Sequence, residues 1–198
     1  MGSLVQPKDP LAREIELLAS GDAAALERAY RACGARIQRL CQGLLGDRAE
    51  AEDATQDVFL KLRERAGQFH GAASLSTWLH RIAVNHCLNL IEKRRLRASR
   101  PLGAAEARSL VDPLRRPPET AAANEARETL RSRLARLSVE HRAVLVLREI
   151  DGLSYDEIAA VLDVPPGTVM SRLARARERW VELAAQESGA QPTAERGR

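Results

Sequence analysis

The sequence predicts an all-α protein made of two small helical domains joined by a flexible linker. Apolar residues recur at the three- and four-residue spacing of helices almost everywhere, and the alternation typical of strands is nearly absent. Prolines and small residues interrupt this pattern between residues 98 and 120. Because such a long structureless stretch is unusual inside one compact domain, we expect domains at residues 9–97 and 121–185 and a disordered polar tail at 186–198.

Capping residues and glycines predict where the helices of the first domain begin and end. Asp9 and Pro10 start a first helix that Gly21 ends, and Asp22 caps a second helix that runs to Gly46. A third helix is expected at residues 49–65 and a fourth at about 75–97, with a loop near 67–76 between them. The second helix carries an apolar stripe that consists of Leu26, Tyr30, Cys33, Ile37, Leu40 and Leu44.

A helix-turn-helix is predicted in the second domain. Ser154 and Glu157 have the spacing of a capping box, which starts a short helix. Pro165 and Pro166 then force an extended link and begin the next helix, because the residue before a proline avoids helical geometry. Asp163 stands where such turns often have glycine, and it can adopt the left-handed conformation at modest cost.

The longer helix of this motif has two different faces. Its apolar face, expected to point to the core, consists of Val169, Leu173, Ala176 and Trp180. Its polar face consists of Thr168, Ser171, Arg172, Arg175 and Arg179. A solvated surface helix is the alternative, but such a helix usually alternates acids with bases, and Glu178 and Glu182 come late. The pattern favours a recognition helix in the major groove of DNA.

Composition limits the other possibilities. The net charge of +4 permits an anionic partner without requiring one. The three cysteines form no C-x-x-C pair, which indicates a reducing compartment. No signal segment or membrane-spanning run is found, so we expect a cytoplasmic protein without membrane insertion.

Three segments resemble one family of proteins. LSYDEIAAVLDVPPGTVMSRLARARERW (153–180) resembles the C-terminal DNA-binding segment of bacterial sigma factors, specifically the extracytoplasmic-function (ECF) group, which is group 4 of the sigma-70 family. EAEDATQDVFLKL (50–62) resembles the core-polymerase-binding segment of that family, and FHGAASLSTWLHRIAVNHCLNLIEKRRL (69–96) resembles its promoter-melting segment. The resemblance covers roughly residues 11–185 in the family's order.

The resemblance implies a function and partners. Residues 9–97 would form sigma region 2, which binds the β′ clamp helices of RNA polymerase core and captures and melts the minus-ten promoter element. Residues 121–185 would form sigma region 4, which docks on the β flap and reads the minus-thirty-five element. The protein would be an alternative sigma factor that initiates transcription in the bacterial cytoplasm, with no catalytic activity or cofactor of its own. An anti-sigma factor is a further expected partner.

Residues for polymerase binding are predicted along one stripe of the third helix. Acids early in a helix also interact favourably with its dipole, which accounts for some of them. The stripe has i, i+3, i+4 and i+7 spacing and can meet a basic partner while Val58, Phe59 and Leu62 pack inward. The predicted polymerase-binding residues are Asp53, Gln56, Asp57, Leu60 and Lys61.

Residues for the minus-ten element are predicted in the loop before the fourth helix and along that helix. Holding bases outside the stack needs a pocket, amide groups that read base edges and cations for phosphates. The predicted residues are Phe69, His70, Ser74, Trp78, Arg81, Asn85, Asn89, Arg94 and Arg95. Two alternatives remain open: Trp78 can equally be a core residue, and basic residues at a helix C-terminus are favourable by themselves.

Residues for the minus-thirty-five element are predicted on the recognition helix. They are Thr168, Met170, Ser171, Arg172, Ala174, Arg175, Arg177 and Arg179. Ser171 and Arg175 are best placed for base edges, and the other arginines for phosphates. Met170 departs from the family, in which a basic residue is common at this place, so promoter preference does not transfer from relatives.

Two other classes of function were weighed against this interpretation. His70, His80, His86 and Cys87 lack the spacing of metal ligands, so no metal site is expected. No phosphate loop or nucleophile–base pair supports an enzyme. The main alternative is a stand-alone dimeric helix-turn-helix regulator, but such a protein needs neither the acidic stripe nor the asparagine helix.

Overall fold

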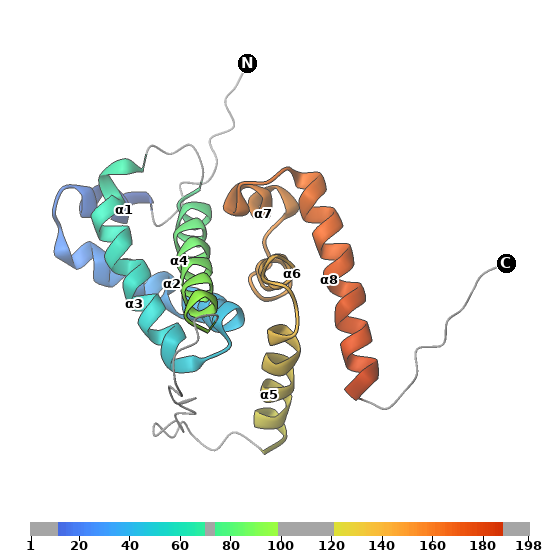
Figure 1. Cartoon of the computed structure of the whole chain (residues 1–198). Helices are drawn as coiled ribbons and strands as arrows, with labels where there is room; N and C mark the ends of the chain where they lie inside the picture. Colours follow the sequence, from blue (N-terminus) through green and yellow to red (C-terminus); the bar gives the residue numbers. More distant parts are fainter. Residues whose placement is uncertain (1–11, 70–73, 99–120, 188–198) are drawn as a thin grey trace.

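The computed structural model describes residues 12–69, 74–98 and 121–187, and within these ranges every regular element is helical. Two lobes lie side by side (Figure 1). The N-lobe contains α1 (Ala12–Ala19), α2 (Ala23–Leu45), α3 (Arg48–Arg65), the 3₁₀ turn η1 (Ala66–Gln68) and α4 (Leu75–Ala98). The C-lobe contains α5 (Ala121–Ala135), α6 (Val139–Leu145), the π-helical η2 (Val146–Ile150), α7 (Tyr155–Leu162) and α8 (Pro166–Glu187).

The predicted helix boundaries of the N-lobe are confirmed by their caps. The carboxylate of Asp22 accepts a hydrogen bond of 2.9 Å from the backbone N–H of Ala24 at the start of α2. Gly46 ends the same helix with φ +77°, a conformation that side chains disfavour. Asp47 accepts a hydrogen bond of 2.8 Å from the N–H of Glu50 and so caps α3.

The core of the N-lobe follows the predicted helical periodicity, with one exception. Ile37, Leu40 and Leu44 of α2 are fully buried, as are the predicted inward residues of α3. Tyr30, which the sequence placed on the same apolar stripe, is 46% exposed. The stripe was wrong there because α2 buries small residues instead, Ala25 and Ala29, and small residues allow neighbouring helices to approach closely.

The last helix of the C-lobe is longer than expected. The sequence placed the domain end at residue 185, whereas α8 continues to Glu187. Two arginines hold this end: Arg133 of α5 donates a hydrogen bond of 2.6 Å to Glu187, and Arg136, the residue after α5, donates one of 2.7 Å to Gln186. The guanidinium of Arg133 also lies 5.6 Å from the ring centroid of Trp180.

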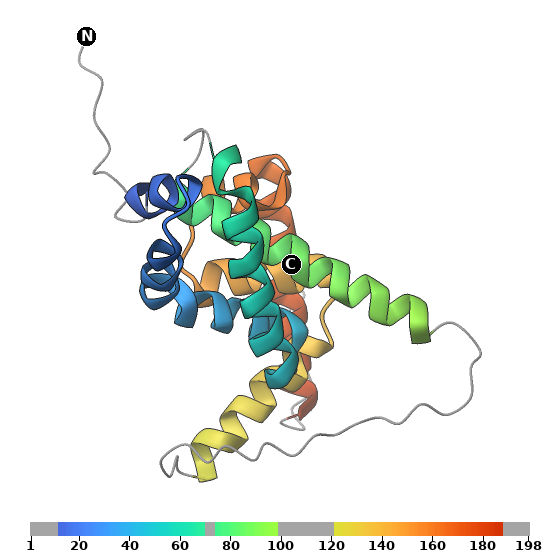
Figure 2. The same cartoon turned by 90° about the vertical axis from the view of Figure 1, so that its left-hand side faces the viewer.

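The two lobes pack against each other, which the sequence did not predict. The helices α2 and α4 of the N-lobe contact α6, η2 and α7 of the C-lobe (Figures 1 and 2). The buried side chains form one hydrophobic cluster that includes residues of both lobes. The predicted cap at Asp9 and Pro10 lies outside the described residues. So do residues 99–120 of the linker predicted at 98–120 and residues 188–198 of the tail predicted at 186–198, whereas Ala98 belongs to α4.

Candidate nucleic-acid interface

The helix-turn-helix has the local geometry that its sequence predicts. Ser154 and Glu157 form the capping box, with each side chain bonded to the other residue's backbone N–H. Asp163 has φ 56° and ψ 49°, so it takes the left-handed conformation at the end of α7. The N–H of Val164 then donates to the carbonyl of Ala159, 3.1 Å away, and closes the turn before α8.

The faces of α8 divide as the periodicity predicts. Val169, Leu173 and Ala176 are buried against the rest of the C-lobe. Met170 is 57% exposed, so its side chain is accessible to a partner of this face. The other predicted DNA-binding residues are exposed (Ser171, Ala174, Arg175, Arg177, Arg179) or partly buried (Thr168, Arg172).

Several polar groups of α8 already have partners inside the C-lobe. The hydroxyl of Ser171 donates to the carbonyl of Thr168, 3.0 Å away, and keeps its lone pairs for an external donor. Arg177 pairs with Glu149 at 2.7 Å and Arg179 pairs with Glu182 at 2.8 Å. Both ion pairs are exposed, so each contributes little to stability and can be exchanged for a phosphate.

The exposed side of α4 carries the predicted amides. Asn85 and Asn89 are exposed one turn apart. Arg81, one turn before Asn85, donates from Nε to the backbone carbonyl of Ala160, 3.1 Å away in α7. That contact joins the face of α4 predicted for DNA to the helix-turn-helix.

The start of α4 holds the two predicted aromatic residues together. Trp78 is partly buried, and its ring centroid lies 5.3 Å from that of Phe69. The hydroxyl of Ser74 accepts a hydrogen bond of 3.0 Å from the N–H of Thr77, which gives Ser74 the role of a helix cap. His70, also predicted for this site, lies outside the described residues.

The basic end of α4 is paired with acids. Arg94 forms an ion pair with Glu50 of α3. Arg95 lies 4.0 Å from Glu92 on its own helix. Both arginines are on the surface, where such pairs are weak and salt-sensitive.

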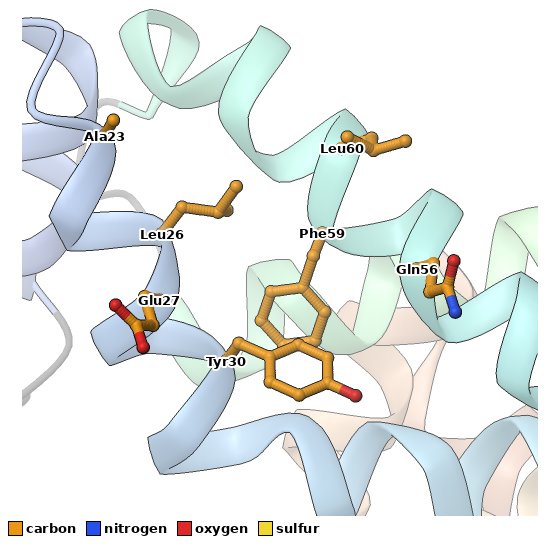
Figure 3. Close-up of a pocket in the computed structure, with 7 residues that line it drawn as sticks. All are labelled: Ala23, Leu26, Glu27, Tyr30, Gln56, Phe59 and Leu60. Carbon is orange, nitrogen blue, oxygen red and sulfur yellow. The ribbon is translucent and has the colours of Figure 1, made fainter.

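The stripe predicted for polymerase binding lies on the surface of α3. Asp53, Gln56 and Asp57 are exposed, and Leu60 is 44% exposed. Gln56 and Leu60 also line a shallow, mostly apolar groove between α2 and α3 (Figure 3). The remaining residues of the groove are Ala23, Leu26, Glu27, Tyr30 and Phe59.

His86 connects two residues of this stripe, a role that sequence reasoning missed. Its Nε2 lies 3.1 Å from the carboxylate of Asp57, and its Nδ1 accepts a hydrogen bond from Lys61. Burial lowers the pKa of His86, and the nearby Lys61 charge lowers it further. A neutral imidazole therefore holds an acid and a base side by side on α3. The sequence did not reveal this contact, because His86 is 25 residues from Lys61 along the chain.

Comparison with known proteins now decides the family. Residues 29–97 match the Sigma-70 region 2 family, and residues 127–179 match Sigma-70, region 4. The ECF RNA polymerase sigma factor SigM of Mycobacterium tuberculosis (strain ATCC 25618 / H37Rv) is 35% identical over 173 residues, which cover 86% of this chain and 84% of that protein. The chain belongs to the ECF RNA polymerase sigma factors.

Two solved structures have the same fold. CnrH, in complex with the cytosolic domain of CnrY, superposes with a TM-score of 0.69 at 23% identity and covers 91% of this chain and 99% of CnrH. The sigma factor RpoE, in complex with the anti-sigma factor NepR from Bartonella quintana, has a TM-score of 0.64 at 23% identity and covers 80% of this chain and 95% of RpoE. The family matches and the similarity to SigM make this chain an alternative sigma factor for transcription initiation, and the dimeric regulator is not favoured.

The two matched regions contain every residue that the sequence predicted for a site. The polymerase-binding and minus-ten residues fall within 29–97, and the minus-thirty-five residues fall within 127–179. Among the described residues of this ECF sigma factor, no group of three His, Cys, Asp or Glu side chains could hold a metal ion. No described helix is both long and apolar enough to span a bilayer.

Proposed function

We propose that this sigma factor binds core polymerase through α3, the minus-ten element through α4 and the minus-thirty-five element through α8. One observation carries the proposal: most described members of three residue sets of different chemistry are exposed, and the sets lie on or next to three separate helices within the two matched regions. The α3 set is mainly acidic and apolar, the α4 set combines amides with aromatic and basic side chains, and the α8 set is rich in arginine. A protein that acts by recruitment needs these surfaces and no catalytic activity of its own.

The α3 surface suits the β′ clamp helices. Exposed carboxylates at Asp53 and Asp57 attract a basic partner. The apolar groove beside Leu60 adds apolar surface whose burial against a partner is favourable (Figure 3). Interfaces of this kind take most of their affinity from a few central apolar or aromatic contacts. Leu60 and Tyr30, at 44% and 46% exposed, are such anchors.

The α4 and α8 surfaces suit single-stranded and duplex DNA respectively. An amide side chain such as Asn85 can both donate a hydrogen bond to a base and accept one from it. The bases of a separated strand expose the edges that such an amide can bind. Phe69 and Trp78 lie together at the start of α4, where a flipped base can stack beside them. On α8, Arg175 can bind a guanine edge with two donors while Arg172 reaches a phosphate.

Two further partners follow from the same proposal. The C-lobe has a groove beside Leu130 and Trp180 that suits docking on the β flap, because it combines exposed apolar area with the cation Arg133. CnrH and RpoE were solved with CnrY and the anti-sigma factor NepR, so we propose that an anti-sigma protein also binds this chain.

Reconstitution with purified core polymerase tests the proposal. We expect the wild-type protein to bind core and to support transcription from promoters of its own genome. Asp53→Arg and Leu60→Arg should each weaken core binding by about tenfold or more, the range of interface hot spots. Glu16→Arg, an equal charge reversal on an exposed residue of α1, is the matched control and should leave binding unchanged. A wild-type protein that ignores core polymerase would refute the proposal.

A further inference from the structure

The interface between the lobes is built from specific polar contacts as well as apolar packing. Arg142 of α6 donates a hydrogen bond of 2.7 Å to the carbonyl of Leu44 in α2. Arg36 of α2 donates one of 2.7 Å to the backbone carbonyl of Asp151, at the end of η2. Together with the bond between Arg81 and Ala160, these contacts join the lobes at three separate points.

Apolar packing across the interface depends on a glycine. A Cβ atom added to Gly43 of α2 would lie 3.0 Å from both methyl groups of Val146, which is closer than ordinary van der Waals contact. Val146 is itself fully buried. The absence of a side chain at residue 43 therefore allows η2 to lie directly against the backbone of α2.

A buried carboxylate lies at the centre of the interface. The side chain of Asp151 is 0% exposed, and neither of its oxygens has a hydrogen-bond partner of good geometry. Two nitrogen-bearing side chains of the other lobe lie beside it: Nε2 of His80 is 3.2 Å away and Nε of Arg36 is 3.7 Å away. Nδ1 of His80 donates to the carbonyl of Ser76, 2.6 Å away, so only a ring with both protons can also donate to Asp151.

The charge of Asp151 makes this contact dependent on both partners. An unpaired carboxylate in a dry site is strongly unfavourable, and removal of one member of a buried pair destabilises the arrangement that buries the other. If the lobes separate, Asp151 loses its contacts with the Arg36 guanidinium and the His80 imidazole, and both side chains lose the carboxylate. The polar contacts of Asp151 thus add specificity to the apolar packing that joins the lobes.

Closure conflicts with simultaneous reading of both promoter elements. Minus-ten and minus-thirty-five elements are about 25 base pairs apart, or roughly 85 Å at ~3.4 Å per base pair. In the closed arrangement the α4 face predicted for the first element touches α7 of the helix-turn-helix predicted for the second, at 3.1 Å. One closed molecule cannot place both surfaces on one promoter.

We propose that Asp151, His80, Arg36 and the Gly43–Val146 contact form a latch that keeps the free protein closed and restrains its entry into promoter complexes. The restraint on promoter complexes rests on the proposed function, whereas the latch itself does not. Because only the open form can enter a promoter complex, the apparent affinity equals the affinity of the open form multiplied by the fraction of molecules that are open. Substitutions that release the latch should therefore raise that affinity.

Small-angle X-ray scattering of the full chain tests the latch independently of function. Asp151→Asn keeps the shape of the side chain and removes its charge, and Gly43→Ala acts from the other lobe without changing any charge. Both should shift the closed–open equilibrium at least tenfold and enlarge the radius of gyration, with helix content by circular dichroism unchanged. Glu14→Gln is the matched control, because it removes a carboxylate that pairs with Arg28 at 2.7 Å inside the N-lobe. Unchanged radii in both variants would overturn the latch.

Promoter complexes with core polymerase test the restraint. We expect the two released variants to form these complexes at severalfold lower protein concentration than wild type and the Glu14→Gln control. The restraint would be overturned if wild type, Asp151→Asn, Gly43→Ala and Glu14→Gln all formed promoter complexes at the same protein concentration while the two released variants were open in solution. If none of the four binds core polymerase while the variants still open, the proposed function fails and the latch stands.

Discussion

The helices α4 and α8 carry the two residue sets predicted for DNA, and they differ in what already engages them. Helix α8 lies on the side of the C-lobe that faces away from the N-lobe (Figure 1), and its ion pairs stay within its own lobe. Helix α4 packs against α7, and Arg81 is bonded across the interface. The difference teaches that an exposed helical face is a DNA surface only if no other part of the same chain occupies it.

The largest effect is expected from loss of a buried residue on the inner face of α8. Leu173→Ala removes a side chain that is 1% exposed and should destabilise the C-lobe by about 2–5 kcal/mol, because the cavity left behind collapses only partly. Hydrogen exchange should accelerate in α8 and remain slow in the core of α2 and α3. Met170→Ala, on the exposed face of the same helix, should change stability by no more than about 0.5 kcal/mol.

The next largest effect is expected on upstream recognition. Arg175→Ala should weaken promoter binding by about 1–3 kcal/mol, roughly 10- to 100-fold, and relax selectivity at one base pair of the minus-thirty-five element. Competition between promoter variants in complexes with core polymerase measures both effects. Arg13→Ala, on α1, is the control. A uniform loss across all sequences would show that Arg175 contacts phosphate instead.

A smaller effect is expected on strand separation. Asn85→Ala should slow open-complex formation severalfold, since one hydrogen bond contributes about 1 kcal/mol. Permanganate reactivity of unpaired thymines follows this step directly. A template with a pre-formed bubble should restore most of the activity, because it removes the need to open the duplex. No rescue by the bubble would contradict a role in melting.

The smallest effect concerns pH. The pKa of His86 is lowered in the folded protein from an ordinary value of about 6.5. Below that pH the unfolded chain binds the proton more tightly than the folded one, so this contribution to stability is present above about pH 6.5 and is lost as the pH falls. The melting temperature should therefore drop between pH 7.5 and pH 5.5. His86→Gln should show a smaller drop, and an equal drop would contradict the assignment.

Features that depend on neighbours along the chain were predictable. The capping box at Ser154 and Glu157, the left-handed Asp163 and the buried face of α8 all follow from signals within one or two helical turns. Partners that come from distant parts of the chain were not. The ion pair between Glu149 of η2 and Arg177 of α8 spans 28 residues, so the sequence of the recognition helix did not reveal this acidic partner.

The sequence alone therefore determined the helices, their polar and apolar faces and the chemistry that each face can perform, because caps and periodicity act over a few residues. Only the tertiary structure decided which of those groups are engaged. His86 became the partner of Asp57 and Lys61, and Asp151 became a buried carboxylate beside His80, because packing joined helices that are far apart in the chain. Contacts between helices that are distant in the chain are properties of the packed lobes, and local sequence does not encode them.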